Sequence, residues 1–313
     1  MKVCAWAMVM FCADARISAG ADDSPIEELA LPPLRIAGVA AQAHTQGLEL
    51  VGEDFFVTAR RDDVQPRRAL LLRTRPGAAG WSVWDVTPQA SRALEAADKL
   101  DHPGGMQFDG KRLWIPVAES RRGGRTVIMA IAPAGLHPGQ PVNPEVEFIV
   151  EDHIGALAVS PTRDELWGAS WDTEDVYIWK RTGELRRKLS LRELQTFGLG
   201  FSSGHQERSG LTVQDWKIRD DRLHACGLFK PASGAAAAPR TRLLTIDRFW
   251  EAAAPVHSVM LSLHDGVELG REGMAVSDEF IYFLPEDLGP ENRLLRTRWK
   301  DLPLTERSKG QTD

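Results

Sequence analysis

One strand pair recurs five times along this chain. Each copy starts at a small residue, usually Gly, and runs through an apolar strand and a polar turn into a second apolar strand. The starting residues lie 50 to 60 positions apart, at Gly47, Gly105, Gly155, Asp215 and Gly273. Repeats of this length are typical of propeller blades, because each unit buries its faces only against its neighbours. We therefore predict an all-β fold, a β-propeller of five blades, with six blades as the alternative.

A third apolar strand follows each copy. These third strands are predicted at 68–73, 126–131, 176–180, 242–246 and 293–298. The fifth copy then runs short, since only a polar tail follows Trp299. The N-terminal segment 34–39 is placed to supply the missing strand, and closing the ring in this way covers edges that would otherwise invite aggregation. In the alternative interpretation, this segment opens the first blade and leaves room for a degenerate sixth. Two short helices are predicted at 91–100 and 191–196.

The first 21 residues have the pattern of a secretory signal peptide. An apolar run at 3–13 follows a basic residue, and Ala19-Gly20-Ala21 is a small-x-small cleavage pattern. The run is too short to span a bilayer. Because Asp14 and Arg16 interrupt the stretch before the cut, a misassigned start and a buried first strand are the alternatives. We expect an exported protein, periplasmic or secreted, whose mature chain begins near Asp22.

Residues 22–313 are then predicted to form a single propeller domain. Loss of the leader removes Cys4 and Cys12, which leaves Cys226 alone and excludes an intramolecular disulfide or a cysteine-rich zinc site. The net charge is −6, from 44 acidic and 38 basic residues, with no long basic run. This balance argues against nucleic acid or an anionic membrane as the main partner. We expect a monomer, without a membrane span in the mature chain, that binds a small polar molecule.

Residues just before each first strand should meet at one mouth of the channel, because a ring brings matched positions together. Polar side chains occupy these positions in every copy: His44, Gln46, His102, Asp152, His153, Gln214, Asp215, Arg271 and Glu272. Imidazole, carboxylate and amide groups suit a divalent cation or direct hydrogen bonds to a polar ligand. In the alternative interpretation they bond to the backbone of inner strands and tie neighbouring blades together.

The chemistry of these side chains predicts a role for each. The predicted catalytic residues are His102, His153, Arg271 and Glu272, in which a His or Glu is the base and Arg stabilises negative charge. The predicted ligand-binding residues are His44, Gln46, Gln214, Asp215, Glu119 and Trp171, of which the last two end second strands. Trp171 packing between blades is the alternative. A divalent cation, if bound, would be held by His44, His102, Asp152, His153 and Glu272.

Several of these segments also carry a family resemblance. The strings HTQGL, HPGG with LWIPVAE, DHIG with GASW, VQD, and REGM with YFLPED resemble domain of unknown function family 6454, secreted propeller-like proteins, from His44 to about Trp299. The resemblance implies a fold and a motif set, without an established activity. The TQGL string is also similar to the opening of plant-type glutaminyl cyclases, which are five-bladed propellers. Their second-blade Glu stands as Gly104 here, and the comparable Glu is Glu272.

Taken together, the sequence predicts an exported propeller with a polar ligand site at the channel mouth. The predicted activity is that of a hydrolase, cyclase or lyase acting on a small polar substrate. A non-catalytic propeller that binds a small molecule or a protein is the alternative, because the fold alone supports neither.

Overall fold

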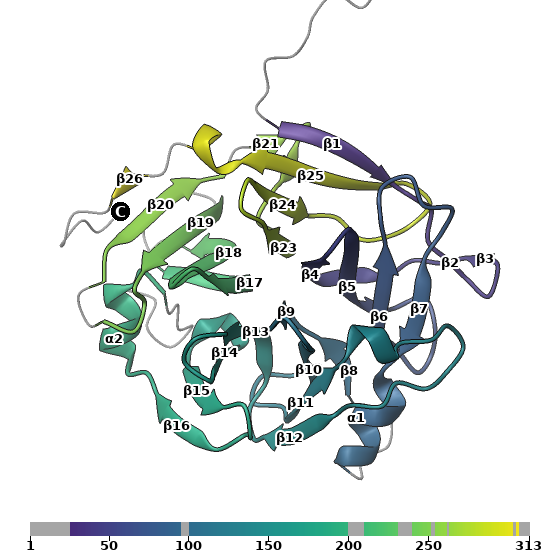
Figure 1. Ribbon diagram of the computed structural model, residues 1–313, viewed down its shortest axis with the longest axis horizontal. Helices are drawn as coiled ribbons and strands as arrows, with labels where there is room; N and C mark the ends of the chain where they lie inside the picture. Colours follow the sequence, from purple (N-terminus) through teal and green to yellow (C-terminus); the bar gives the residue numbers. More distant parts are fainter. Residues whose placement is uncertain are drawn as a thin grey trace, which may run out of the picture.

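Five antiparallel sheets form blades around a central channel (Figure 1). This computed structural model describes residues 26–94, 100–199, 210–230, 240–251, 254–261, 263–302 and 305–306. The predicted leader at 1–21 lies outside the described residues. One strand of each blade lies nearest the axis, and the other strands of the blade follow it outward (Figure 1). The prediction of a five-bladed propeller is confirmed.

The blades follow one another in chain order. Blade 1 contains β4 (His44–Val51), β5 (Asp54–Arg61), β6 (Arg68–Thr74) and β7 (Ser82–Asp85). Blade 2 contains β8 (Leu100–Pro103), β9 (Gln107–Phe108), β10 (Leu113–Glu119), β11 (Thr126–Ile131) and β12 (Val146–Val150). Blade 3 contains β13 (Ile154–Ser160), β14 (Glu165–Ser170), β15 (Val176–Lys180) and β16 (Leu185–Lys188). Blade 4 contains β17 (Gly210–Arg219), β18 (Arg222–Lys230), β19 (Arg240–Asp247), β20 (Val256–Met260) and β26 (Thr305–Glu306). Blade 5 contains β23 (Gly273–Val276), β24 (Phe280–Leu284), β25 (Asn292–Arg298) and β1 (Ile26–Leu31).

Three of the four recurring glycines, Gly47, Gly105 and Gly273, allow the innermost strands to crowd around the axis. A Cβ atom at Gly105 would lie 2.5 Å from Oδ1 of Asp215, and one at Gly47 would lie 2.7 Å from the Cα atom of Gly105. No side chain fits at such distances, so these positions need glycine because neighbouring backbones approach closely. The repeat seen in the sequence therefore marks the crowded centre of the ring.

The hydrophobic core is divided among the five junctions between blades. Leu48 and Tyr282 belong to the cluster between blades 1 and 5, and Trp216 belongs to the cluster between blades 3 and 4. The remaining clusters lie between blades 1 and 2, 2 and 3, and 4 and 5. Each blade thus buries both faces against its neighbours, which is why the repeat needs a closed ring for stability.

An N-terminal strand closes the ring, but it is not the predicted one. Strand β1 pairs with β25, with Ile26 opposite Thr297 and Leu31 opposite Asn292. The predicted segment 34–39 instead belongs to a small hairpin of β2 (Arg35–Ile36) and β3 (Val39–Ala40). The physical reason is a turn at Ala37 and Gly38, whose φ values of 51° and 81° break an extended strand. The predicted closure by an N-terminal strand is confirmed, but the prediction that residues 34–39 form this strand was wrong.

The other elements are short. Helix α2 (Leu191–Thr196) begins at a capping box formed by Ser190 and Glu193, and it was predicted correctly. Helix α1 (Thr87–Ala93) was predicted too late, at 91–100, because Pro88 in the first turn begins the helix and Leu100 already belongs to β8. The remaining elements are η1 (Pro133–Gly135), η2 (Trp171–Thr173), β21 (Leu263–His264), β22 (Val267–Glu268) and η3 (Trp299–Asp301). Within the described ranges, no helix is long and apolar enough to cross a membrane.

Candidate functional site

A pocket of about 350 Å³ lies where the first strands of the five blades begin. Eight of the predicted site residues line it: His44, Gln46, His102, His153, Trp171, Gln214, Arg271 and Glu272. Every blade contributes at least one of these side chains. The structure thus brings together residues that lie more than two hundred positions apart in the sequence, as matched positions in a ring require. Their roles in binding or catalysis remain predictions.

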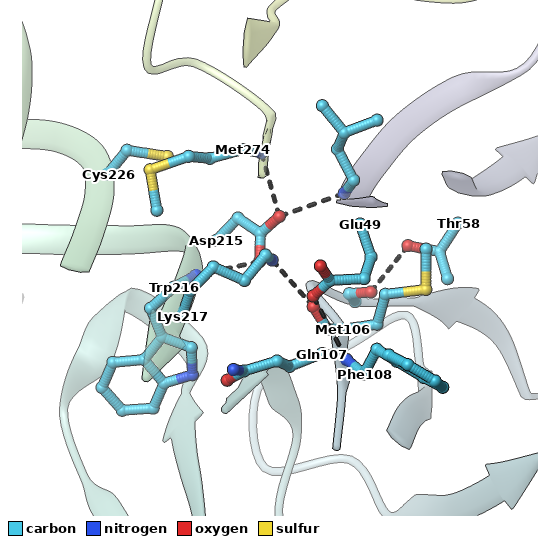
Figure 2. Close-up of polar contacts among 12 residues, drawn as sticks. Glu49, Thr58, Met106, Gln107, Phe108, Asp215, Trp216, Lys217, Cys226 and Met274 are labelled. Carbon is cyan, nitrogen blue, oxygen red and sulfur yellow. Dashed lines mark hydrogen bonds and ion pairs between the residues drawn. The ribbon is translucent and has the colours of Figure 1, made fainter. Parts of the chain in front are cut away.

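Asp215 lies inside the channel and not on the pocket lining. Its carboxylate is fully buried, and Oδ2 accepts hydrogen bonds from the N–H groups of Leu48, at 3.0 Å, and Met274, at 2.9 Å (Figure 2). Oδ1 accepts from the N–H group of Trp216 at 2.9 Å and from Nζ of Lys217 at 2.6 Å. With its lone pairs occupied in this way, Asp215 joins blades 1, 4 and 5 instead of facing a ligand.

The carboxylates of Asp152 and Glu119 are also engaged away from the pocket. Asp152 accepts hydrogen bonds from the Tyr177 hydroxyl, at 2.9 Å, and from the N–H group of His153, at 2.8 Å. Glu119 is paired with Arg121, at 2.6 Å, and its oxygen accepts from the N–H group of Arg125 at 3.1 Å. A tyrosine hydroxyl and a backbone N–H group therefore fix the direction of Asp152, and neighbouring arginines fix that of Glu119.

Among the residues that the structure describes, the side chains predicted to hold a cation do not form a compact set of ligands. In the part of the chain that the structure describes, one group of three potential ligands has all its ligand atoms within 4.8 Å, namely Glu28, His264 and Asp265. These residues lie outside the pocket, and Nη1 of Arg293 is 3.5 Å from Glu28 and 3.8 Å from Asp265. A guanidinium in this position already neutralises the carboxylates, as expected for a surface ion-pair network.

His44 stands at the edge of the pocket next to an acidic partner. Its Nδ1 lies 2.6 Å from Oδ1 of Asp287. This hydrogen bond raises the pKa of His44, with a smaller contribution from the nearby charge of Glu272, although burial opposes both. An imidazole held in this way carries positive charge more readily than a free one, and it places that charge beside Glu272.

The other two histidines of the pocket lie deeper, and their pKa values are lowered instead of raised. Burial lowers the pKa of His102 well below its usual value, and the charges of His153 and Arg60 add to this effect. Burial also lowers the pKa of His153, although the hydrogen bond from its ring to the Glu119 carbonyl works against this. Both imidazoles are therefore neutral near pH 7.

Glu272 is the most perturbed acidic group on the lining. Its side chain is almost completely buried, and burial raises its pKa from 4.5 to about 7. The charges of His44 and Arg271 lower the pKa but do not cancel the cost of burial. Nε of Arg271 is 3.6 Å from Oε1 of Glu272, beyond the reach of a good hydrogen bond. The pocket thus holds a carboxyl group that titrates near neutral pH.

We expect the wild-type protein to lose stability relative to Glu272→Gln as the pH rises from 4.5 to about 7. The unfolded chain releases the Glu272 proton first, because burial raises the pKa only in the folded state. Ionisation in this window therefore favours unfolding, and the difference approaches about 3 kcal/mol above it. Below the window both states are protonated and the difference disappears.

Urea unfolding of both proteins at pH values below and above this window measures the effect. Glu286→Gln is the control, because the Glu286 carboxylate lies on the surface beside Arg293. A constant difference between wild type and Glu272→Gln across the window would contradict the burial of an ionisable carboxyl.

Lys217 and Gln107, which fill the channel beneath the pocket, were not among the residues predicted from the sequence. Nζ of Lys217 donates to Asp215 and, at 2.7 Å, to the carbonyl of Met106, and its side chain is fully buried (Figure 2). Oε1 of Gln107 accepts from the N–H groups of Val159 and Ile218, both at 2.9 Å. The sequence signal that could have identified Lys217 is a charged residue between apolar neighbours on an inner strand.

One family model matches more than half of this chain. The family of unknown function DUF6454 matches residues 15–196. The chain belongs to this family. Because DUF6454 is a family of unknown function, membership assigns no activity to the chain. No curated protein matches the chain. The resemblance to plant-type glutaminyl cyclases stays a prediction.

Solved structures of glycoside hydrolases resemble this DUF6454 member in fold. An engineered GH43 enzyme with endo-xylanase and exo-arabinofuranosidase activity is 12% identical, with 91% of this chain and 55% of that chain covered and a TM-score of 0.53. A bifunctional GH43-CE protein from Bacteroides eggerthii is 11% identical, with 90% and 36% covered and a TM-score of 0.53. A GH43 endo-arabinanase from Bacillus licheniformis is 9% identical, with 85% and 96% covered and a TM-score of 0.51. The chain thus spans about half and about a third of the first two, and these likenesses show the fold alone.

Proposed function

We propose that this protein is a hydrolase that performs acid–base chemistry on a small polar substrate at the mouth of the channel. The observation that carries the proposal is Glu272, a buried carboxyl group on the pocket lining whose pKa is raised to about 7. A group that titrates near the working pH is efficient both as a base and as an acid. A carboxyl group whose pKa is shifted by burial and which lines a cleft is a candidate for a functional group.

The residues around Glu272 supply what hydrolysis needs besides proton transfer. Glu272 takes a proton from water as the water oxygen bonds to the reacting carbon, and it returns the proton to the leaving group as the old bond breaks. Arg271 offers positive charge where negative charge develops. The amides of Gln46 and Gln214 offer donors and acceptors that orient a polar substrate.

The similarity in fold to glycoside hydrolases suggests the first probes. We propose nitrophenyl glycosides of arabinose and xylose, followed by nitrophenyl esters, because the engineered GH43 structure is described with endo-xylanase and exo-arabinofuranosidase activity. We also propose that the protein is exported and acts as a monomer, in keeping with the leader pattern at 1–21 and with a ring whose edge is already closed by β1.

Glu272→Gln is expected to lower kcat by about 100-fold to 10,000-fold, the usual contribution of a general acid or base. The amide keeps the shape of the carboxyl but cannot transfer a proton, so product binding should change little. The wild-type pH profile should show one limb near pH 7, set by Glu272. Release of nitrophenol under saturating substrate, with product binding by calorimetry, measures both quantities.

Glu286→Gln is the matched control and should retain wild-type kcat, because its carboxylate pairs with Arg293 away from the pocket. Unchanged turnover by Glu272→Gln would overturn the proposal. Binding of a probe without turnover by the wild-type protein would instead support a non-catalytic propeller that binds a small molecule.

A further inference from the structure

Three aromatic rings meet on one side of the pocket. The ring centroids of His153 and Trp171 are 4.6 Å apart, those of His102 and His153 are 4.9 Å apart, and those of His102 and Trp171 are 6.3 Å apart. All three residues line the pocket, and they come from blades 2 and 3 and the turn that follows β14. We call Trp171, His102 and His153 the ring cluster.

The neighbours of the two imidazoles fix where each ring carries its proton. Nη1 of Arg60 lies 3.0 Å from Nδ1 of His102, and the Ser120 hydroxyl, which donates to Asp101, lies 3.3 Å from the same nitrogen. Because a guanidinium only donates and makes the shorter contact, Nδ1 is the acceptor and the proton is on Nε2. Nδ1 of His153 lies 2.8 Å from the carbonyl oxygen of Glu119, which only accepts, so here Nδ1 carries the proton and Nε2 keeps a lone pair. Burial keeps both rings neutral. The Nε2 atoms of these two adjacent rings therefore have different hydrogen-bonding roles. Nε2 of His102 is a donor, and Nε2 of His153 is an acceptor.

A segment with unfavourable backbone angles follows the third ring of the cluster. Directly after Trp171, Asp172 and Thr173 have φ values of 56° and 55°, in the left-handed region that costs free energy for residues other than glycine. Asp172 accepts from Arg122 and Lys230, both at 2.8 Å. Because such angles persist only where surrounding contacts impose them, the backbone directly after Trp171 is held in one conformation.

This arrangement selects a class of ligand. A carboxylate or phosphate has only acceptors to offer and would meet the lone pair of His153, whereas an ammonium group has only donors and would meet the N–H group of His102. Neighbouring hydroxyl groups on a ring both donate and accept, so they satisfy both imidazoles at once. The indole offers an apolar surface for the C–H groups of such a ring.

We propose that the ring cluster is a recognition subsite for a neutral polyhydroxylated ring, that is, a sugar. This inference rests on the proposed function and names the class of its substrate. An amide also carries a donor and an acceptor, but it does not present the ring of hydroxyl groups that the two imidazoles and the indole would contact together. Amide binding is therefore an outcome of the test and not part of the proposal.

The test uses titration calorimetry of the full chain with arabinose, xylose, glucose and mannose. Parallel titrations use gluconate as the anion, glucosamine as the cation, and glutamine amide as the amide probe. We expect at least one neutral sugar to bind more tightly than the charged and amide probes. Trp171→Ala and Arg60→Met should each weaken its binding by about tenfold, the equivalent of one good contact.

Arg61→Met is the matched control, because Arg61 is adjacent in sequence but pairs with Asp63 and not with His102. Nitrogen NMR of the histidine rings gives an independent readout that does not depend on any ligand. We expect protonated Nε2 in His102 and protonated Nδ1 in His153, and we expect the His102 pattern to change in Arg60→Met only.

Four results would overturn the inference: other tautomers, tighter binding of a charged or amide probe, no binding of any neutral sugar at millimolar concentration, or equal binding by Trp171→Ala. Failure of the proposed function looks different. In that case sugars bind as expected, but neither wild type nor Glu272→Gln shows turnover.

Discussion

Asp215→Ala is expected to remove most of the stability of the propeller. The substitution removes the carboxylate that lies 2.6 Å from Nζ of the fully buried Lys217, and breaking a buried ion pair by removing one partner costs about 3 to 5 kcal/mol. It also leaves three backbone N–H groups without acceptors, those of Leu48, Trp216 and Met274, and each adds about 1 to 3 kcal/mol. The sum is comparable with the whole free energy of unfolding of an ordinary domain, about 5 to 15 kcal/mol.

Urea unfolding followed by tryptophan fluorescence measures this effect. Asp215→Asn is the milder variant if Asp215→Ala does not fold, because the amide oxygen retains an acceptor for the backbone N–H groups. Glu184→Ala is the control, since the Lys180–Glu184 ion pair is exposed and should contribute less than about 1 kcal/mol. If the free energy of unfolding of Asp215→Ala lies within about 1 kcal/mol of the wild-type value, the Asp215 carboxylate does not hold the blades together.

Deletion of residues 22–31 from the mature chain is expected to open the ring. The deletion removes β1, which exposes the backbone of β25 and takes Leu31 out of the core between blades 1 and 5. Loss of Leu31, Leu29 and Ile26 from their contacts corresponds to about 3 to 6 kcal/mol of apolar burial. The uncovered edge of β25 is also a template for pairing with another chain, so aggregation should accompany the loss of stability.

Thermal melting and light scattering of the shortened chain test this closure against a chain that begins at Asp22. Leu31→Glu probes the same contact if the deletion cannot be purified. Val39→Ser is the matched control, because Val39 belongs to the segment predicted from sequence to close the ring but is 66% exposed. A shortened chain that melts like its parent, or a large effect of Val39→Ser, would contradict closure by β1.

The five blades could be predicted because their signals are local. Each hairpin turns within a few residues, at positions such as Gly52, Gly110 and Asp221 that adopt positive φ. The apolar pattern of each strand and the helix cap at Ser190 are equally local. Such features are settled by the preferences of neighbouring residues, so they can be found one segment at a time.

Closure of the ring could not be located in the same way. Strand β1 pairs with residues 261 to 271 positions further along the chain, and its sequence contains two glutamates beside the apolar residues. An edge strand of this kind has a weak pattern of its own, since one side faces solvent. The apolar segment at 34–39 was a stronger local candidate, and only the pairing partner decides between the two.

By itself, the sequence determined the blade repeat, the glycines at the crowded centre and the polar residues that meet at the channel mouth. The tertiary structure decided which of these residues face the pocket. Asp215 shares its place in the repeat with glycines, yet it binds the backbones of two other blades, while Glu272 faces the pocket and has a pKa near 7 because protein atoms from several blades exclude water around it. The direction of a side chain and the solvation of its charge depend on neighbours that are distant in sequence, so they exist only once the ring is closed.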